Sequence, residues 1–337
     1  MLDVYSALSL GVTFVVTLVT TFVATPIVAK MMRSRGITGV DVHKIAKTEV
    51  PEMCGLAILI GLTAGIVVYT ITMPLAIREA AAFIGAVLIA GAVGIIDDLH
   101  PLGARMKPAL TALACAPILL LGTYVPYPDV PLYGPVRLTI VYPILIPIAL
   151  AVTSNSINMM DVMNGAMPGT VAIIAFAMVG ILLWAGDFST AALASGLLAA
   201  MLAFFYFNRY PSKVFDGDTG SLSVGAALGA LAIIGRIEAV TIVALIPQIM
   251  NSFYGLSSVR GLRERREIHQ RPTELLSNGL LRASNQKGAP VTLARLILAT
   301  GPLGEKELVR GMMILTAVSS ILAVFTYWIM VSVVSVK

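Results

Sequence analysis

The sequence has little charge. Asp, Glu, Lys and Arg together make up 12% of its 337 residues, against roughly 25% in an ordinary soluble domain. Hydrophobic residues make up 58% and the mean hydropathy is +0.91. This composition excludes an ordinary soluble protein and indicates an integral membrane protein. The chain has only two cysteines, Cys54 and Cys115, at or within apolar runs. Such thiols are more often packing residues than a disulfide or a metal site, so neither receives a role.

Apolar runs free of internal charge recur along the chain. Each has about the length that crosses a hydrocarbon core at about 1.5 Å per residue. They predict an all-α polytopic membrane protein, a single membrane domain over residues 1–337 with a long loop over 256–310. In the fifth run, Pro143 and Pro147 predict a kinked or tilted helix. The ten expected transmembrane helices cover residues 6–29, 53–73, 80–96, 109–124, 138–154, 168–185, 189–207, 220–235, 239–255 and 311–334.

The basic residues are distributed unevenly over the loops. With ten helices, the odd-numbered connections lie on one side of the membrane and the even-numbered ones on the other. The even connections and the two termini carry just Arg78, Arg137, Arg236 and Lys337 of the 23 Lys and Arg residues. The positive-inside rule therefore places the odd loops in the cytoplasm and both termini outside. This bias also explains the pI near 9.2 without any nucleic-acid partner.

Every unusual polar motif falls on the side assigned to the cytoplasm. The motifs follow helices one, three, five, seven and nine, and the outer loops are short. They are "GVDVHKIAKTEVPEMCG" (39–55), "DDLHPLGARMK" (97–107), "NSINMMDVMNG" (155–165), "NRYPSKVFDGDTGS" (208–221) and "RERREIHQRPTEL" (263–275).

Each motif has an ordinary structural explanation when it is considered alone. Acidic pairs such as Asp97 and Asp98 often lie at solvated helix ends, and Asn-rich stretches often form turns. Asp218 or Thr219 could cap a helix that begins near Ser221. Glu52 and His269 could be solvated loop residues, and the arginines could serve only the positive-inside signal. These explanations would all have to hold at once, on one face of the protein, so we favour a shared functional site.

The residue types in these motifs suit a metal bound with phosphates. Carboxylates and amide oxygens are the hard ligands that Mg²⁺ takes while it keeps water and substrate phosphates in its shell. Lys107, His269 and the arginines are phosphate donors. The sequence therefore predicts a site for a divalent cation with a diphosphate. Its candidate oxygen ligands are Asp97, Asp98, Asn155, Asn158, Asp161, Asn164, Asp216 and Asp218.

These motifs resemble those of the polyprenyl-phosphate N-acetylhexosamine-1-phosphate transferase superfamily over nearly the whole chain. The aspartate pair followed by Leu102 and Lys107 carries the resemblance, as do "NSINMMDVMNG", "YPSKVFDGDTGS", "PEMCG" and "IPQIMNSFYGL". Within the superfamily, the chain is most similar to archaeal and eukaryotic UDP-GlcNAc:dolichyl-phosphate GlcNAc-1-phosphate transferases. The resemblance implies ten helices, a cytosolic site and an Mg²⁺-dependent transfer of sugar 1-phosphate from a UDP-sugar to a polyprenyl phosphate, with Mn²⁺ as an alternative metal.

The resemblance also implies a role for particular residues. Asp218 and Asn158 would bind the metal, Lys107 would hold phosphate oxygens, and Asp97 and Asp98 would orient or deprotonate the lipid phosphate or help hold the metal. The residues expected to bind substrate are Glu52, Asn155, Asn164, Gly165, Phe215, His269 and Arg271.

The chain departs from the eukaryotic pattern at three places. In the ninth loop, Gln270 stands where the family has an arginine beside the histidine, so Arg271 would be an approximate substitute. Asp161 follows the bacterial pattern whereas Asn164 follows the eukaryotic one. Pro101 replaces a polar residue after the aspartate pair.

Several alternatives stay open at the level of sequence. A transferase that uses another UDP-sugar or undecaprenyl phosphate, for cell-wall or surface glycan synthesis, is the main competitor. A transporter would need ionisable residues near the bilayer midplane or matched broken helices, and a scaffold would not need five polar motifs on one face. The oligomeric state is open, with a homodimer as one alternative. A prokaryotic, archaeal plasma membrane is favoured over the endoplasmic reticulum because the chain is compact.

Overall fold

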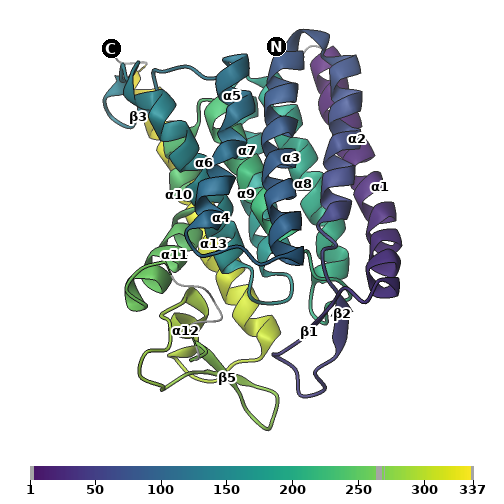
Figure 1. Ribbon diagram of the computed structural model, residues 1–337. Coiled ribbons are helices and arrows are strands. Elements are labelled where there is room, and N and C mark those ends of the chain that lie inside the picture. Colours follow the sequence, from purple (N-terminus) through teal and green to yellow (C-terminus); the bar gives the residue numbers. More distant parts are fainter. Residues whose placement is uncertain (1–3, 263–267, 269, 335–337) are drawn as a thin grey trace.

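The computed structural model describes residues 4–262, 268 and 270–334 (Figure 1). Helices dominate the fold, because most of the chain consists of apolar runs that must satisfy their backbone hydrogen bonds internally. The α-helices are α1 (Val4–Ser34), α2 (Leu56–Thr72), α3 (Ile77–Leu99), α4 (Met106–Thr111), α5 (Ala116–Leu121), α6 (Val141–Met160), α7 (Ala166–Ala185), α8 (Phe188–Asn208), α9 (Gly217–Ile234), α10 (Glu238–Ala244), α11 (Ile246–Ser258), α12 (Leu293–Leu298) and α13 (Glu305–Val334), with 3-10 turns η1 (Pro74–Ala76) and η2 (Ala112–Cys115).

The structure places helix at each of the ten predicted positions, and the all-α polytopic class is confirmed. In the described residues, seven helices are long and apolar enough to cross a membrane. Helices α10 and α11 together form one further candidate, bent by 66° at their junction, where Pro247 lies in the first turn of α11. The second and fourth predicted helices, Leu56–Thr72 and Met106–Leu121, are apolar but shorter. The number of crossings and their sidedness stay predictions.

Helix α9 lies inside the bundle, and its packing explains how it comes so close to its neighbours. Its residues from Thr219 to Ile233 are all buried. A Cβ atom added at Gly94 of α3 would lie 2.4 Å from the Asp218 carbonyl oxygen, and one at Gly225 would lie 2.4 Å from Cα of Ser154 on α6. Because these glycines have no side chain, α3 and α6 approach the α9 backbone directly and bring their ends to the start of α9.

Three small antiparallel hairpins complete the described fold. They are β1 (Thr38–Val40) with β2 (Glu49–Pro51), β3 (Asp129–Val130) with β4 (Gly134–Pro135), and β5 (Thr273–Leu275) with β6 (Leu281–Ala283).

The two ends of the helix bundle differ in what they carry. Hairpin β1–β2, strand β5 and helix α12 lie at the lower end in Figure 1, together with the start of α13. Strand β3 and both chain termini lie at the upper end. Termini at the same end require an even number of passages through the bundle, which agrees with the predicted ten-helix topology. The described parts of the motif-bearing loops gather at the lower end.

Candidate active site

Two carboxylates from different helices meet on one lysine. Asp97 lies in the last turn of α3 and Asp218 in the first turn of α9, while Lys107 lies in α4. The Lys107 Nζ atom is 2.6 Å from Asp97 Oδ2 and 2.6 Å from Asp218 Oδ2. The second oxygen of Asp97 accepts the backbone N–H of Leu102. The structure thus joins the aspartate pair and its lysine to the "GDTGS" string.

Asn158 extends this group from the last turn of α6. Its Nδ2 group donates to Asp218 Oδ1 and to Ser221 Oγ at 2.8 Å. Asp218 is therefore held from both sides, by an amide at one oxygen and by an ammonium at the other. We refer to Asp97, Lys107, Asn158 and Asp218 as the Lys107 cluster.

Asp98 holds the start of α9 instead of pointing at the Lys107 cluster. Its Oδ1 atom accepts the backbone N–H of Asp218 at 2.8 Å, and its Oδ2 atom accepts the backbone N–H and the hydroxyl of Thr219 at 3.0 and 2.7 Å. The suggestion that Asp218 or Thr219 caps α9 is wrong. Both lie inside the helix, and the residue at the N-cap position, Asp216, makes no side-chain capping bond. The cap comes from another helix.

Gly217 makes this cap possible. Its φ angle is +68°, a left-handed conformation that favours glycine. A Cβ atom there would lie 2.7 Å from Asp98 Oδ2. The glycine of the "GDTGS" string therefore leaves room for the Asp98 carboxylate, and Asp98 in turn fixes the direction of the Asp218 backbone.

A second acidic pair lies beside the Lys107 cluster. Burial raises the pKa of Asp161 to about 6, assisted by the charge of Asp218 and opposed by a hydrogen bond with Asp216. Burial and the neighbouring Asp161 raise the pKa of Asp216 well above its usual range. Two carboxylates this close share a proton more readily than they both ionise. In the described residues, Asp216 Oδ2 is buried without a hydrogen-bond partner.

The donor set fits a hard divalent cation. Five carboxylates, Asp97, Asp98, Asp161, Asp216 and Asp218, gather near the single ammonium of Lys107 in this part of the described structure. Carboxylate and amide oxygens with no thiolate suit Mg²⁺. Asp218 and Asn158 already lie in contact, and the Asn158 amide can present its oxygen after a half-turn of the group.

The residues expected at the nucleotide come together around the first loop. The backbone N–H of Phe215 donates to the Pro51 carbonyl at 2.8 Å, and the N–H of Cys54 donates to the Phe215 carbonyl at 2.9 Å. A Cβ atom at Gly39 would lie 3.2 Å from both Glu52 Oε2 and Phe215 Cδ2. Glu52 and Phe215, far apart in the sequence, therefore both lie against Gly39.

Asn164 and Gly165 lie in the turn between α6 and α7. The Asn164 side chain donates to Asp41 Oδ2 at 2.9 Å, and its backbone N–H donates to Glu305 Oε1 at 2.8 Å. Gly165 has a φ of +85° and donates its N–H to Asn208 Oδ1 at 2.9 Å. These bonds fix the turn and hold it against the first loop.

The remaining residues predicted to bind substrate lie in different surroundings. The Asn155 amide nitrogen donates to Thr111 Oγ1 at 2.9 Å and to the Ala151 carbonyl at 2.8 Å, so this side chain ties α6 to α4. Arg271 is exposed in the loop before β5. His269 lies outside the described residues. Both cysteines are free and buried, as expected for packing residues.

Sequence reasoning missed several polar residues that the structure places beside the predicted ones. Asp41 and Lys44 stand in the quoted first-loop motif but received no role. Asn208, buried at the end of α8, accepts from Gly165 and donates to the Val214 carbonyl at 2.8 Å. Glu305 begins the last helix and had no motif around it. An acidic residue shortly before the last apolar run was the available signal.

Comparisons with known proteins point to one family. The sequence profile of glycosyl transferase family 4 matches residues 80–236. A Sulfolobus acidocaldarius protein provisionally named UDP-N-acetylglucosamine:dolichyl-phosphate N-acetylglucosaminephosphotransferase is 29% identical over 73% of this chain and 77% of its own. A probable undecaprenyl-phosphate N-acetylglucosaminyl 1-phosphate transferase of Bacillus subtilis is 30% identical over 71% of this chain and 66% of its own. A phospho-N-acetylmuramoyl-pentapeptide-transferase of Desulforamulus reducens is 30% identical over 70% of this chain and 75% of its own.

Fold, site and relatives together define the class: a polytopic membrane protein with an acidic, lysine-containing site where its helix ends converge. The chain belongs to glycosyl transferase family 4.

Proposed function

We propose that this protein transfers a sugar 1-phosphate from a UDP-sugar to a polyprenyl phosphate and releases UMP. The observation that carries the proposal is the Lys107 cluster, where two carboxylates, an amide and a lysine from four helices meet at one end of a membrane bundle. N-acetylglucosamine 1-phosphate and dolichyl phosphate are the first candidates, because the Sulfolobus acidocaldarius relative carries those substrates in its name. The reaction would then begin the assembly of a lipid-linked glycan.

The reaction requires negative charge to be neutralised around one phosphorus atom. An oxygen of the lipid phosphate forms a bond to the β-phosphorus of the UDP-sugar while the bond to the bridging oxygen breaks, and UMP leaves with that oxygen. Nucleophile, centre and leaving group are all anionic, so positioning and neutralisation supply most of the catalysis. A bound Mg²⁺ would supply part of that neutralisation.

The chain's own residues divide the remaining work. Lys107 would hold phosphate oxygens, since an ammonium is a mobile point charge for phosphate. Asp218 and Asn158 would hold the metal. Asp97 would orient the lipid phosphate or take its proton, and Asp98, through its three bonds to the start of α9, would position Asp218. Glu52, Phe215 and Asn164 would border the nucleotide.

The main alternative is another donor or lipid within the same reaction. The relatives in Bacillus subtilis and Desulforamulus reducens are named for undecaprenyl phosphate and for a muramoyl-pentapeptide substrate. The described site residues would serve either pair of substrates. They therefore support the transfer reaction more strongly than they support a particular UDP-sugar or lipid. We place the site on the cytoplasmic side of an archaeal plasma membrane, in keeping with the basic loops and the archaeal relatives.

A turnover assay tests this proposal. Purified protein in detergent receives UDP-GlcNAc, dolichyl phosphate and Mg²⁺, and UMP and lipid-linked sugar are measured together. Equal amounts of both products are expected, with none after metal removal or in Asp218→Asn. If a folded protein forms neither product across a panel of UDP-sugars and polyprenyl phosphates, the transferase assignment is wrong.

A further inference from the structure

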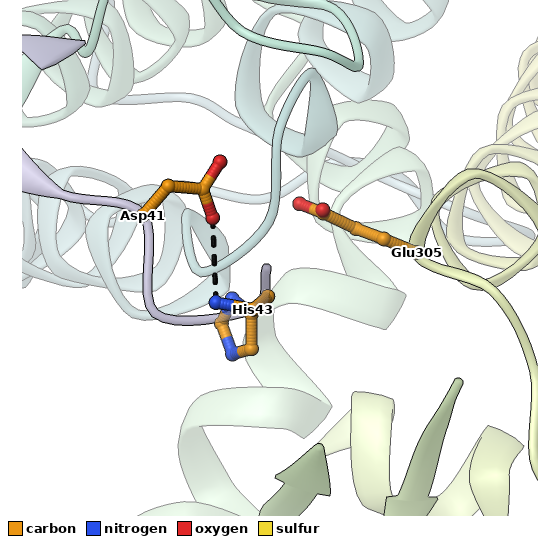
Figure 2. Close-up of side chains that lie close together, drawn as sticks. All are labelled: Asp41, His43 and Glu305. Atoms are coloured by element: carbon orange, nitrogen blue, oxygen red, sulfur yellow. Dashed lines mark hydrogen bonds between the residues drawn. The ribbon is translucent and has the colours of Figure 1, made fainter. Parts of the chain in front are cut away.

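A second polar cluster shares no residue with the Lys107 cluster. Asp41 and His43 belong to the loop after β1, and Glu305 is the first residue of α13. One ligand atom from each of the three lies within 4.8 Å of the others. In Figure 2 the carboxylates of Asp41 and Glu305 face each other across a gap, with His43 beside it. With Asn164, which donates to both carboxylates, we refer to these residues as the Glu305 cluster.

The two carboxylates are deeply buried but unequally satisfied. Asp41 is 3% exposed and Glu305 is 4% exposed. Burial raises the pKa of Asp41, but hydrogen bonds from Lys44 and Asn164 outweigh it and hold the pKa below its usual range. Glu305 Oε1 accepts the Asn164 N–H. Among the described residues, Glu305 Oε2 is buried with no hydrogen-bond partner.

An ionised buried oxygen without a partner costs several kcal/mol on the order-of-magnitude scale for polar burial. It calls for a proton or for a cation. A proton would satisfy the Glu305 oxygen but would not involve Asp41 or His43. A cation would also explain why a ring nitrogen of His43 lies within 4.8 Å of an oxygen of each carboxylate.

We propose that Asp41, His43 and Glu305 bind a divalent transition-metal ion of the Zn²⁺ class. Imidazole with two carboxylates suits Zn²⁺, Co²⁺ or Mn²⁺, whereas Mg²⁺ prefers oxygen ligands alone. Metal–ligand distances of about 2.0–2.2 Å require the three side chains to draw closer than they now lie. Side-chain rotation in the loop that carries Asp41 and His43 provides that movement.

Lys44 is the residue that a cation would displace from Asp41. Its Nζ atom now forms an ion pair with Asp41 Oδ2 and lies 5.0 Å from the centroid of the Tyr210 ring. The ring face offers the ammonium a second partner, so Asp41 can turn to a metal without leaving Lys44 unsatisfied. The bound ion would fasten the first loop, the α6–α7 turn and the start of α13 together.

Metal content of the purified full chain tests the proposal. Protein in detergent is loaded with Zn²⁺, dialysed against metal-free buffer and analysed by inductively coupled plasma mass spectrometry. We expect one retained Zn²⁺ per chain in the wild type and in Asp218→Asn. Loss of a second-shell partner costs about 10–100-fold in metal affinity, so loss of a ligand in His43→Ala or Glu305→Gln should cost at least that much. His100→Ala, an exposed histidine elsewhere, should retain the ion.

A second measurement needs no variant. Co²⁺ added to the wild type should give visible d–d absorption that Zn²⁺ abolishes in a one-to-one titration. Absence of stoichiometric metal in the folded wild type overturns the site, as does equal retention in His43→Ala, Glu305→Gln and His100→Ala. Neither result bears on turnover, because Asp218→Asn removes the proposed transfer while leaving this ion in place.

Discussion

The Lys107 cluster and the Glu305 cluster use buried carboxylates in opposite ways. In the first, each oxygen of Asp97 and Asp218 has a donor from Lys107, Leu102 or Asn158. In the second, one oxygen of Glu305 has none among the described residues. The first cluster is pre-organised by its own side chains. The second leaves a buried carboxylate oxygen without a donor, and its members join distant parts of the chain.

The largest expected effect concerns the first cluster. Asp218→Asn keeps the shape of the side chain but removes the charge that pairs with Lys107. By comparison with removal of one pre-organised electrostatic group, we expect transfer to fall by about 100-fold or more. Initial rates of UMP release at saturating substrates measure the effect. Glu305→Gln should lower transfer far less, and equal losses in the two variants would remove the functional distinction between the clusters.

Asp98→Ala should reduce both stability and transfer. The substitution removes three hydrogen bonds from the first turn of α9, and loss of a helix cap costs about 0.5–2 kcal/mol. We expect a lower unfolding temperature and a lower kcat with little change in KM, because Asp218 is misplaced while the expected nucleotide residues are not. Asp98→Asn should recover part of both. Unchanged kcat in a destabilised Asp98→Ala would limit this residue to a structural role.

Gly217→Ala tests the space that the cap requires. The left-handed φ of +68° strains any residue with a Cβ atom, and the new methyl group would also collide with the Asp98 carboxylate. Gly186 is the matched control, because its φ is +77° and a Cβ there meets nothing within 4 Å. Strain alone costs about 1–2 kcal/mol, so Gly217→Ala should lose more stability than Gly186→Ala in thermal unfolding. Equal losses of stability in the two variants would mean that the Asp98 side chain moves aside without a cost in free energy.

The smallest effect is expected at Asp216, and it should depend on pH. The pKa of this carboxyl is raised by burial and by Asp161. A raised pKa means that the folded state favours the proton, so stability is full below the unfolded pKa of about 3.9 and declines as pH rises from there. Asp216→Asn removes the titrating carboxyl and therefore removes this decline in stability with pH. Its unfolding temperature should exceed that of the wild type at pH 8, and the gap should close toward pH 4.

The structure brings together residues that the sequence had already grouped, and the reason is physical. Asp97, Lys107, Asn158 and Asp218 were all predicted, because each sits in a short motif beside the end of an apolar run, and hydropathy places such ends on one face. Asp98 was assigned to the reacting groups with its neighbour. Successive residues on a helix point in directions about 100° apart, so adjacent aspartates face different partners, and only the position of α9 decides which.

The sequence by itself determined the membrane class, the positions of the ten apolar helices and the gathering of polar motifs at one end. Transfer of apolar side chains from water to lipid depends on local composition, so a window along the chain contains that information. The tertiary structure alone decided that Asp98 caps a helix 120 residues away and that Glu305 bonds to Asn164 across 141 residues. Those contacts depend on how closely packed helices seat against one another, which glycines such as Gly94 and Gly225 permit and which no local pattern records.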